Sequence, residues 1–393
     1  MNGMSLLRRT ARAIAAACAA LLFAGCTAAS VSSGSIWTDG PVPSLPTAPP
    51  PPSGASWKTV GPAGFIPMGV AYISIAINQA TGVPYIAFSD TGSGTSSAMS
   101  FNGGWGFIGA QFFSSPQQAV FTRMAVDPSG IAYVAYQDLA TGGINVCEYL
   151  SPSWMHLGVT NFDVGQPSTG VALALDASGT PYVAYLDSTG RAKVQKWTGV
   201  TGWQPVGSQS LFNSSASNVS LAIDSSGNPW VAYEDGPTGN KATVMRFDGA
   251  SWSIVGSAAG SASTGSVANT SLALDSFDVP YLACWDNGTG GRATVKTFQA
   301  GAWINVGSPG FSANNPYDIT IAVRGGVPYV LYRDGSPGGA TLMTYGTSWQ
   351  PVGSPGFTPV NVQFISLALD PLGTPYVAFA DASSFEPYVM AYH

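Results

Sequence analysis

Short segments in which apolar and polar residues alternate recur along the chain from residue 57 to the C-terminus. A representative unit opens with residues 271–275 (SLALD) and continues, after a turn, with a Pro-Tyr-Val-Ala-Tyr-x-Asp segment. A third alternating segment follows, such as residues 242–247 (ATVMRF), and then a fourth with the pattern Trp-x-x-Val-Gly. Alternation with a period of two, bounded by Gly, Pro, Asn or Asp, is typical of β-strands. Each unit therefore predicts four short strands.

The unit is present seven times. Its second segment opens at Pro84-Tyr85, Ala132-Tyr133, Pro181-Tyr182, Pro229-Trp230, Pro280-Tyr281, Pro328-Tyr329 and Pro375-Tyr376. The tryptophans that open the fourth segment are Trp57, Trp105, Trp154, Trp203, Trp252, Trp303 and Trp349. Four strands in a repeat of roughly 40–50 residues are typical of a propeller blade. The sequence predicts an all-β protein, a seven-bladed β-propeller of four-stranded blades over residues 57–393.

The two ends of the repeat region complement each other. The Trp57–Gly61 segment precedes the first complete unit, whereas the last unit ends at Tyr388–His393 without a fourth segment. Pairing of the N-terminal strand with the last blade would complete that blade and leave no exposed sheet edge. A solenoid of the same units, the alternative architecture, would not explain this complementarity.

Composition agrees with a turn-rich β protein. Only 9% of the residues are charged, against roughly 25% in an average chain, and there are 48 Gly and 29 Pro. This excludes coiled coils and long amphipathic helices. The net charge is -6, and the repeat region has no cluster of Lys and Arg of the kind that binds phosphates. We therefore expect no nucleic-acid partner.

The N-terminus has the features of a targeting signal. Arg8, Arg9 and Arg12 precede an apolar run, Ala13–Ala24, which is too short to span a bilayer. The run ends in residues 22–26 (LFAGC), which resemble the lipobox of bacterial lipoproteins. This resemblance implies a signal peptide over residues 1–25, lipidation of Cys26 and, because Thr27 is not Asp, an outer-membrane or cell-surface address in the cell envelope. The alternative is ordinary secretory cleavage with an incidental cysteine.

A linker separates this signal from the repeats. Residues 26–56 are rich in Ser, Ala and Pro and include four consecutive prolines at 49–52. Such a composition favours an extended chain and builds no core. We predict a tether that holds the propeller away from the membrane surface.

Most residues present in every unit are expected to build blades. An aspartate ends the second segment of each unit, at Asp90, Asp138, Asp187, Asp235, Asp286, Asp334 and Asp381. These carboxylates could bind cations, but capping of the Gly-rich loops that follow them is the favoured interpretation. Six phenylalanines after the Val-Gly step are interpreted as wedges between blades rather than ligand platforms: Phe65, Phe113, Phe162, Phe212, Phe311 and Phe357. Cys147 and Cys284 are expected to be separate buried thiols, not a disulfide.

No catalytic or metal-binding motif is present. The chain has two histidines, His156 and His393, and the acids outside the repeated positions are scattered. Nucleophilic triads, metal clusters and His-centred acid–base machinery all need converging groups. We predict no cofactor and no metal. A glycan-processing enzyme, with paired carboxylates in the propeller funnel, is the alternative to a non-catalytic protein.

Positions that vary between units indicate a candidate binding surface. The residue before the repeated Asp is Glu234, Trp285 or Arg333 in units four to six, and in the other units it is Ser89, Gln137, Leu186 or Ala380. The corresponding first-strand position is Ser, Thr or Ala in six units and Arg123 in the second. A charged and aromatic mixture suits sugars, whose ring faces stack on aromatic side chains. We predict a ligand site at Glu234, Trp285 and Arg333, with Arg123 and Asp318 near the axis as the next candidates.

The repeats resemble those of uncharacterised bacterial surface propellers and, more loosely, of seven-bladed lectin propellers. This resemblance rests on fold and repeat style and carries no ligand motif. It implies a lipid-anchored binding or adhesion module without catalytic activity, with a glycan or a surface protein as its partner.

Overall fold

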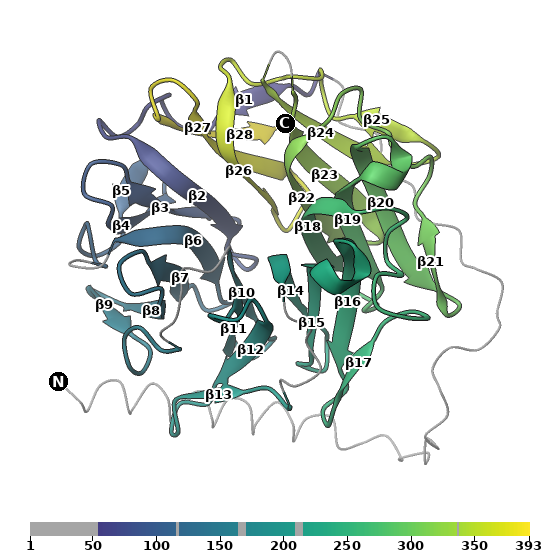
Figure 1. Ribbon diagram of the computed structural model, residues 1–393. Helices are drawn as coiled ribbons and strands as arrows, with labels where there is room; N and C mark the ends of the chain where they lie inside the picture. Colours follow the sequence, from purple (N-terminus) through teal and green to yellow (C-terminus); the bar gives the residue numbers. More distant parts are fainter. Residues whose placement is uncertain (1–53, 115–117, 164–169, 209–214, 336–337) are drawn as a thin grey trace, which may run out of the picture. The chain divides into compact units, whose positions relative to one another are not determined.

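The computed structural model describes residues 54–393 apart from 115–117, 164–169, 209–214 and 336–337. It contains seven four-stranded antiparallel sheets arranged in a ring, and the inner strands of adjacent sheets are neighbours all the way round (Figure 1). The prediction of a seven-bladed β-propeller is thereby confirmed. In the described part of the chain, no helix is long and apolar enough to cross a membrane.

Blades are numbered 1 to 7 in chain order. Their inner strands are β2 (Val70–Ile77), β6 (Ala119–Val126), β10 (Val171–Leu175), β14 (Ala216–Ile223), β18 (Val267–Leu274), β22 (Tyr317–Arg324) and β26 (Val362–Leu369). The second strands are β3 (Pro84–Asp90), β7 (Ala132–Asp138), β11 (Pro181–Leu186), β15 (Pro229–Asp235), β19 (Pro280–Asp286), β23 (Val327–Arg333) and β27 (Pro375–Asp381). The third strands are β4 (Ser96–Phe101), β8 (Ile144–Leu150), β12 (Ala192–Trp197), β16 (Lys241–Phe247), β20 (Arg292–Gln299), β24 (Ala340–Tyr345) and β28 (Pro387–Tyr392). The outer strands are β5 (Trp105–Phe107), β9 (Ser153–His156), β13 (Trp203–Pro205), β17 (Trp252–Ile254), β21 (Ala302–Asn305), β25 (Trp349–Pro351) and, in blade 7, β1 (Trp57–Thr59). Two short 3₁₀ turns, η2 (Gly236–Thr238) and η3 (Asn287–Thr289), follow β15 and β19.

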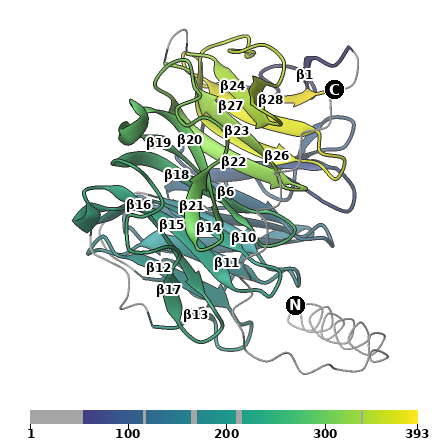
Figure 2. The same ribbon diagram turned by 90° about the vertical axis from the view of Figure 1, so that its right-hand side faces the viewer.

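The ring closes as the sequence predicts. Strand β1 pairs antiparallel with β28, with Trp57 opposite Tyr392, and the two strands lie together in Figure 1 and Figure 2. The pairing extends to a hydrogen bond of 3.1 Å from the Ser56 amide to the His393 carbonyl. The first described strand and the last therefore belong to the same blade.

The repeated tryptophans join each blade to the preceding one. In all seven blades the indole Nε1 donates a hydrogen bond of 2.7–2.8 Å to a backbone carbonyl of the preceding blade. Taking the tryptophans in chain order from Trp57 to Trp349, the acceptors are the carbonyls of Val352, Val60, Ile108, Leu157, Val206, Val255 and Val306. Five of the repeated phenylalanines stack on these indoles; the closest pair is Trp57 and Phe357, with ring centroids 3.8 Å apart. The wedge interpretation is confirmed for these five, and Phe212 lies outside the described residues.

The core lies between adjacent blades. Second strands such as β7 and β15 are buried along their whole length, because both faces of each sheet pack against neighbouring sheets. Cys147 and Cys284 are free buried thiols in blades 2 and 5, as predicted, and burial raises the pKa of Cys147 to about 12. These thiols serve as small core side chains.

The aspartates that end the second strands hold the adjacent loops. In five blades the carboxylate accepts a hydrogen bond from a backbone amide of the loop that follows, at Ser93, Ala140, Thr189, Gly288 and Ser383. In the other two blades Asp235 and Asp334 accept from the hydroxyls of Thr243 and Thr341 on the third strand. The capping interpretation is confirmed for these five blades, whereas η2 after Asp235 begins without a side-chain capping bond.

Candidate functional site

A β-bulge interrupts the start of the inner strand in six blades. In blade 1, for example, Tyr72 and Ile73 lie opposite the single residue Phe88. The first bulged residue has a left-handed backbone in each case: Tyr72 (φ 53°), Phe121 (54°), Asn218 (49°), Asn269 (56°), Asp318 (48°) and Phe364 (54°). Blade 3 has no bulge in its described residues and has Gly170 (φ 126°) directly before β10. We call these seven residues the bulge ring.

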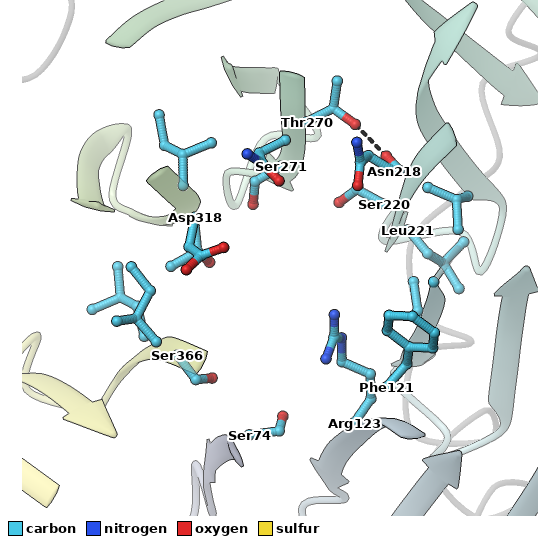
Figure 3. A pocket seen from close by; sticks show the side chains of 18 of the residues that line it. Ser74, Phe121, Arg123, Asn218, Ser220, Leu221, Thr270, Ser271, Asp318 and Ser366 are labelled. Atoms are coloured by element: carbon cyan, nitrogen blue, oxygen red, sulfur yellow. Dashed lines mark hydrogen bonds between the residues drawn. The ribbon is translucent and has the colours of Figure 1, made fainter. Parts of the chain in front are cut away.

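The bulge ring surrounds the mouth of a central funnel of about 510 Å³. The funnel is lined by the first half of every inner strand, at the end of the blade where the capping aspartates lie. Figure 3 shows side chains from several blades around an open centre, with Arg123 and Asp318 projecting into it from opposite sides. This is the face that the variable positions of the sequence indicated.

The bulge ring has an aromatic half and a polar half. Phe364, Tyr72 and Phe121 come from the consecutive blades 7, 1 and 2, and the Tyr72 ring centroid lies 4.9 Å and 5.2 Å from those of Phe364 and Phe121. Asn218 and Asn269 and then Asp318 come from blades 4, 5 and 6. Asn and Asp tolerate left-handed backbone, whereas bulky side chains are strained there by roughly 1–3 kcal/mol. The aromatic half therefore carries strain that the fold avoids in the polar half.

Glu234 is the buried hydrogen-bond acceptor for two residues of the polar half. Its carboxylate, only 7% exposed, accepts hydrogen bonds from the Ser217 hydroxyl (2.6 Å), the Asn218 side-chain amide and the Asn269 backbone amide (2.8 Å). The Thr270 hydroxyl adds a bond to the Asn218 carbonyl, drawn dashed in Figure 3. Glu234 thus fixes two bulges in adjacent blades, and it acts on the funnel through them.

Hydroxyl groups link the inner strands two residues beyond the bulge. Ser74, Ser220, Ser271 and Ser366 each accept a hydrogen bond of 2.9–3.1 Å from a backbone amide of the next blade, at Met124, Leu272, Ile321 and Ile75. Arg123 takes this position in blade 2 and Ala172 in blade 3. The Arg123 guanidinium donates to the Thr122 carbonyl (3.0 Å), and burial lowers its pKa below the usual value.

The five predicted site residues do not form a single cluster. Arg333 and Asp318 meet in an ion pair of 3.3 Å, and the Arg333 guanidinium lies 5.0 Å from the Tyr317 ring centroid. Arg123 and Asp318 line the funnel, as their expected position near the axis implies. Trp285 is outside it, and its indole Nε1 is buried against Gly291 with no hydrogen-bond partner among the described residues. Ligand binding by these residues remains a prediction.

The sequence interpretation missed Tyr72, Phe121, Gly170 and Phe364. Aligning the units places these four residues in the same column as Asn218, Asn269 and Asp318. Gly, Asn and Asp are the residues that adopt left-handed backbone routinely. The column therefore contained a signal for the bulge, and its three aromatic residues would have stood out as exceptions.

The funnel offers little for acid–base or metal chemistry. Of the described residues that line it, Asp318 is the one carboxylate. Within the described ranges no group of three or more His, Cys, Asp or Glu side chains is placed to hold a metal ion. Glycosidases of the common type need two carboxylates across the scissile bond. The lining is suited to binding by stacking and hydrogen bonding.

Comparison with known proteins gives similarity at the level of the fold. No protein-family model matches the chain, and no curated protein matches it. The SapL1 lectin, solved with alpha-methyl fucoside, is similar in structure with a TM-score of 0.51 and 13% identity, over 75% of this chain and 99% of that one. A fucose-recognising lectin of Aleuria aurantia, described as a six-bladed propeller, has a TM-score of 0.46 and 16% identity over 76% of this chain and 99% of its own. An ulvan lyase has a TM-score of 0.49 and 15% identity, over 83% and 94%. At these identities the SapL1 match supports the propeller fold.

Proposed function

We propose that this protein is a non-catalytic carbohydrate-binding module and that the funnel mouth is its ligand site. The observation that carries the proposal is the divided bulge ring, with three strained aromatic residues facing three polar ones. Strain of this kind is retained where the side chain has a task. The apolar faces of a sugar ring can stack on Tyr72, Phe121 and Phe364, and its hydroxyls can form hydrogen bonds with Asn218 and Asn269.

Two further points support binding over catalysis. The described funnel lining has one carboxylate, and that carboxylate is paired with Arg333. A general acid and a second carboxylate would both be needed to process a glycan by the common route. SapL1, whose TM-score with this chain is 0.51, was solved with a bound fucoside, which agrees with a sugar-binding use of this fold.

Replacing the aromatic bulge residues should weaken glycan binding without unfolding the protein. Tyr72→Asn and Phe364→Asn install the residue that blades 4 and 5 use at the same position, so the left-handed backbone is retained with less strain. A glycan array on the detergent-solubilised full chain identifies a ligand, and calorimetry measures its affinity. We expect each variant to lose roughly 3- to 10-fold in affinity, the equivalent of one stacking contact.

The matched control is Phe277→Asn. Phe277 is 82% exposed and lies in the β18–β19 hairpin, at the opposite end of the inner strands from the funnel mouth. Its replacement should leave affinity unchanged. Unchanged affinity in Tyr72→Asn and Phe364→Asn, with unchanged melting temperatures, would place the glycan site elsewhere.

We further propose that the module is anchored in the cell envelope, at the outer membrane or cell surface, through a lipidated Cys26. Cys26 and the tether lie outside the described residues, so the proposal rests on the lipobox-like residues 22–26 and the Pro-rich segment behind them. Adhesion to a glycan-bearing surface would then be its role.

Cys26→Ala should release the protein from membranes. Loss of the thiol removes the only atom to which the thioether-linked lipid could attach, so the variant should move to the soluble fraction and lose palmitate labelling. Cys18→Ala is the matched control, because Cys18 lies within the apolar run of the signal, and it should remain membrane-bound and labelled. A Cys26→Ala protein that is still labelled and membrane-bound would refute the anchor.

A further inference from the structure

In one sector of the funnel, no described side chain accepts the inner-strand amides that serine hydroxyls accept in other blades. In four blades a serine hydroxyl accepts the amide of the next inner strand, for example the Met124 amide on Ser74. In blade 2 this position is Arg123, and a guanidinium has donors only. In blade 3 it is Ala172, which has no polar side chain. Leu173 and Leu221 are the residues whose amides correspond to Met124 in blades 3 and 4, and both line the funnel here.

The same sector is lined by small residues. Gly170 lies where the other six blades have a bulge residue with a side chain, and a Cβ added to it would meet no atom of the described residues within 4 Å. Ala172, two residues further on, is also small. Two small residues of blade 3 therefore line the funnel next to blade 2, which carries Arg123.

Arg123 has no counter-ion in the described part of the chain. Its one recorded hydrogen bond goes to the neutral Thr122 carbonyl. Asp318 projects into the funnel from the opposite side and is paired with Arg333, and Glu234 already has three donors. Arg123 is partly buried, so an unpaired cation is unfavourable at this position, and an anion that bound it would offset part of that cost.

We propose that this sector, formed by Arg123, Gly170 and Ala172, binds an anionic group, a carboxylate or a sulphate ester, on an acidic glycan. The inference rests on the proposed carbohydrate-binding function and names its substrate class. The planar guanidinium matches two oxygens of either group, and charge-assisted bonds of this kind are about twice as strong as neutral ones. The rest of the sugar would reach the aromatic half through the adjacent Phe121.

The decisive variant is Arg123→Ser. It restores the residue that four other blades have at this position, and its hydroxyl can accept the Leu173 amide, so the fold should be at least as stable as before. Calorimetry on the full chain in detergent would use trigalacturonate, its methyl ester and a sulphated galactose oligosaccharide without carboxylates. For each anionic probe that the wild type binds, we expect the affinity of the variant to be roughly 10- to 100-fold lower. For the methyl ester we expect the variant and the wild type to have the same affinity.

A second measurement does not depend on any sugar. Millimolar sulphate should raise the melting temperature of the wild type more than that of Arg123→Ser; sulphate stabilises folded proteins generally, so only the difference counts. Lys58→Ser, which removes one positive charge from the exposed outer strand β1, is the charge-matched control and should behave as wild type. If neither sulphate nor any acidic glycan distinguishes Arg123→Ser from wild type, the anion site is refuted, while neutral glycans that still bind would leave the proposed function standing. If sulphate stabilises the protein through Arg123 but no glycan binds, the anion site stands and the proposed carbohydrate-binding function is refuted.

Discussion

Deletion of residues 27–62 will lower the melting temperature by roughly 10 °C or more, whereas deletion of residues 27–54 will leave it unchanged. The longer deletion removes strand β1 and with it the ladder to β28. It also removes Trp57, which donates to the Val352 carbonyl and stacks on Phe357. Removing a large aromatic side chain from such a site costs about 3 kcal/mol or more, and β28 becomes an exposed edge.

The shorter deletion is the matched control for this experiment. It removes most of the predicted tether and keeps Ser56, whose amide bonds the His393 carbonyl at the end of the chain. Melting would be followed by circular dichroism, with aggregation measured by light scattering because an open edge favours association. Equal melting temperatures for both deletions would show that blade 7 is stable without its fourth strand.

Replacement of Glu234 will destabilise the fold and weaken ligand binding together. Glu234→Ala removes the buried acceptor that the half-buried Ser217, Asn218 and Asn269 share, which should lower the free energy of unfolding by about 3 kcal/mol. Glu234→Gln keeps one acceptor oxygen and should cost roughly half as much. Because Asn218 and Asn269 lose their positions in the funnel lining, affinity for the glycan should fall in both variants.

The control for Glu234 is Glu386, an exposed carboxylate in the β27–β28 connection. Glu386→Ala makes the same change in net charge and should leave stability and affinity as in the wild type. Denaturant titration gives the free energy of unfolding, and calorimetry under native conditions gives the affinity. If Glu234→Ala unfolds at the same denaturant concentration as wild type, the carboxylate does not hold the two bulges.

The features of the fold that repeat in every blade could be predicted from the sequence. The tryptophan column and the missing last strand were enough to predict both the blade count and closure through Trp57, because a propeller places equivalent residues in equivalent contacts. The capping aspartates followed from local turn chemistry, which depends on residues close in sequence.

The candidate site was harder to predict, because it depends on register and on contacts distant in sequence. A bulge of one residue turns Tyr72 and its equivalents toward the funnel, and strand alternation alone does not reveal it. The variation at the position of Glu234 suggests an exposed residue. Glu234 is buried, and its carboxylate accepts hydrogen bonds from Asn218 and from Asn269, which lies 35 residues away in the sequence. Trp285 and Arg333 occupy equivalent positions, but only Arg333 meets another predicted residue, Asp318.

A crystal structure of the protein with the glycan identified on the array tests the central proposal most directly. We predict a sugar ring in the funnel, stacked on Tyr72, Phe121 or Phe364, with its hydroxyls bonded to the Asn218 and Asn269 side and an acidic group on Arg123. A sugar bound instead in the smaller hollow of about 320 Å³ between blades 6 and 7, beside Tyr317 and Arg333, with the funnel empty, would contradict it.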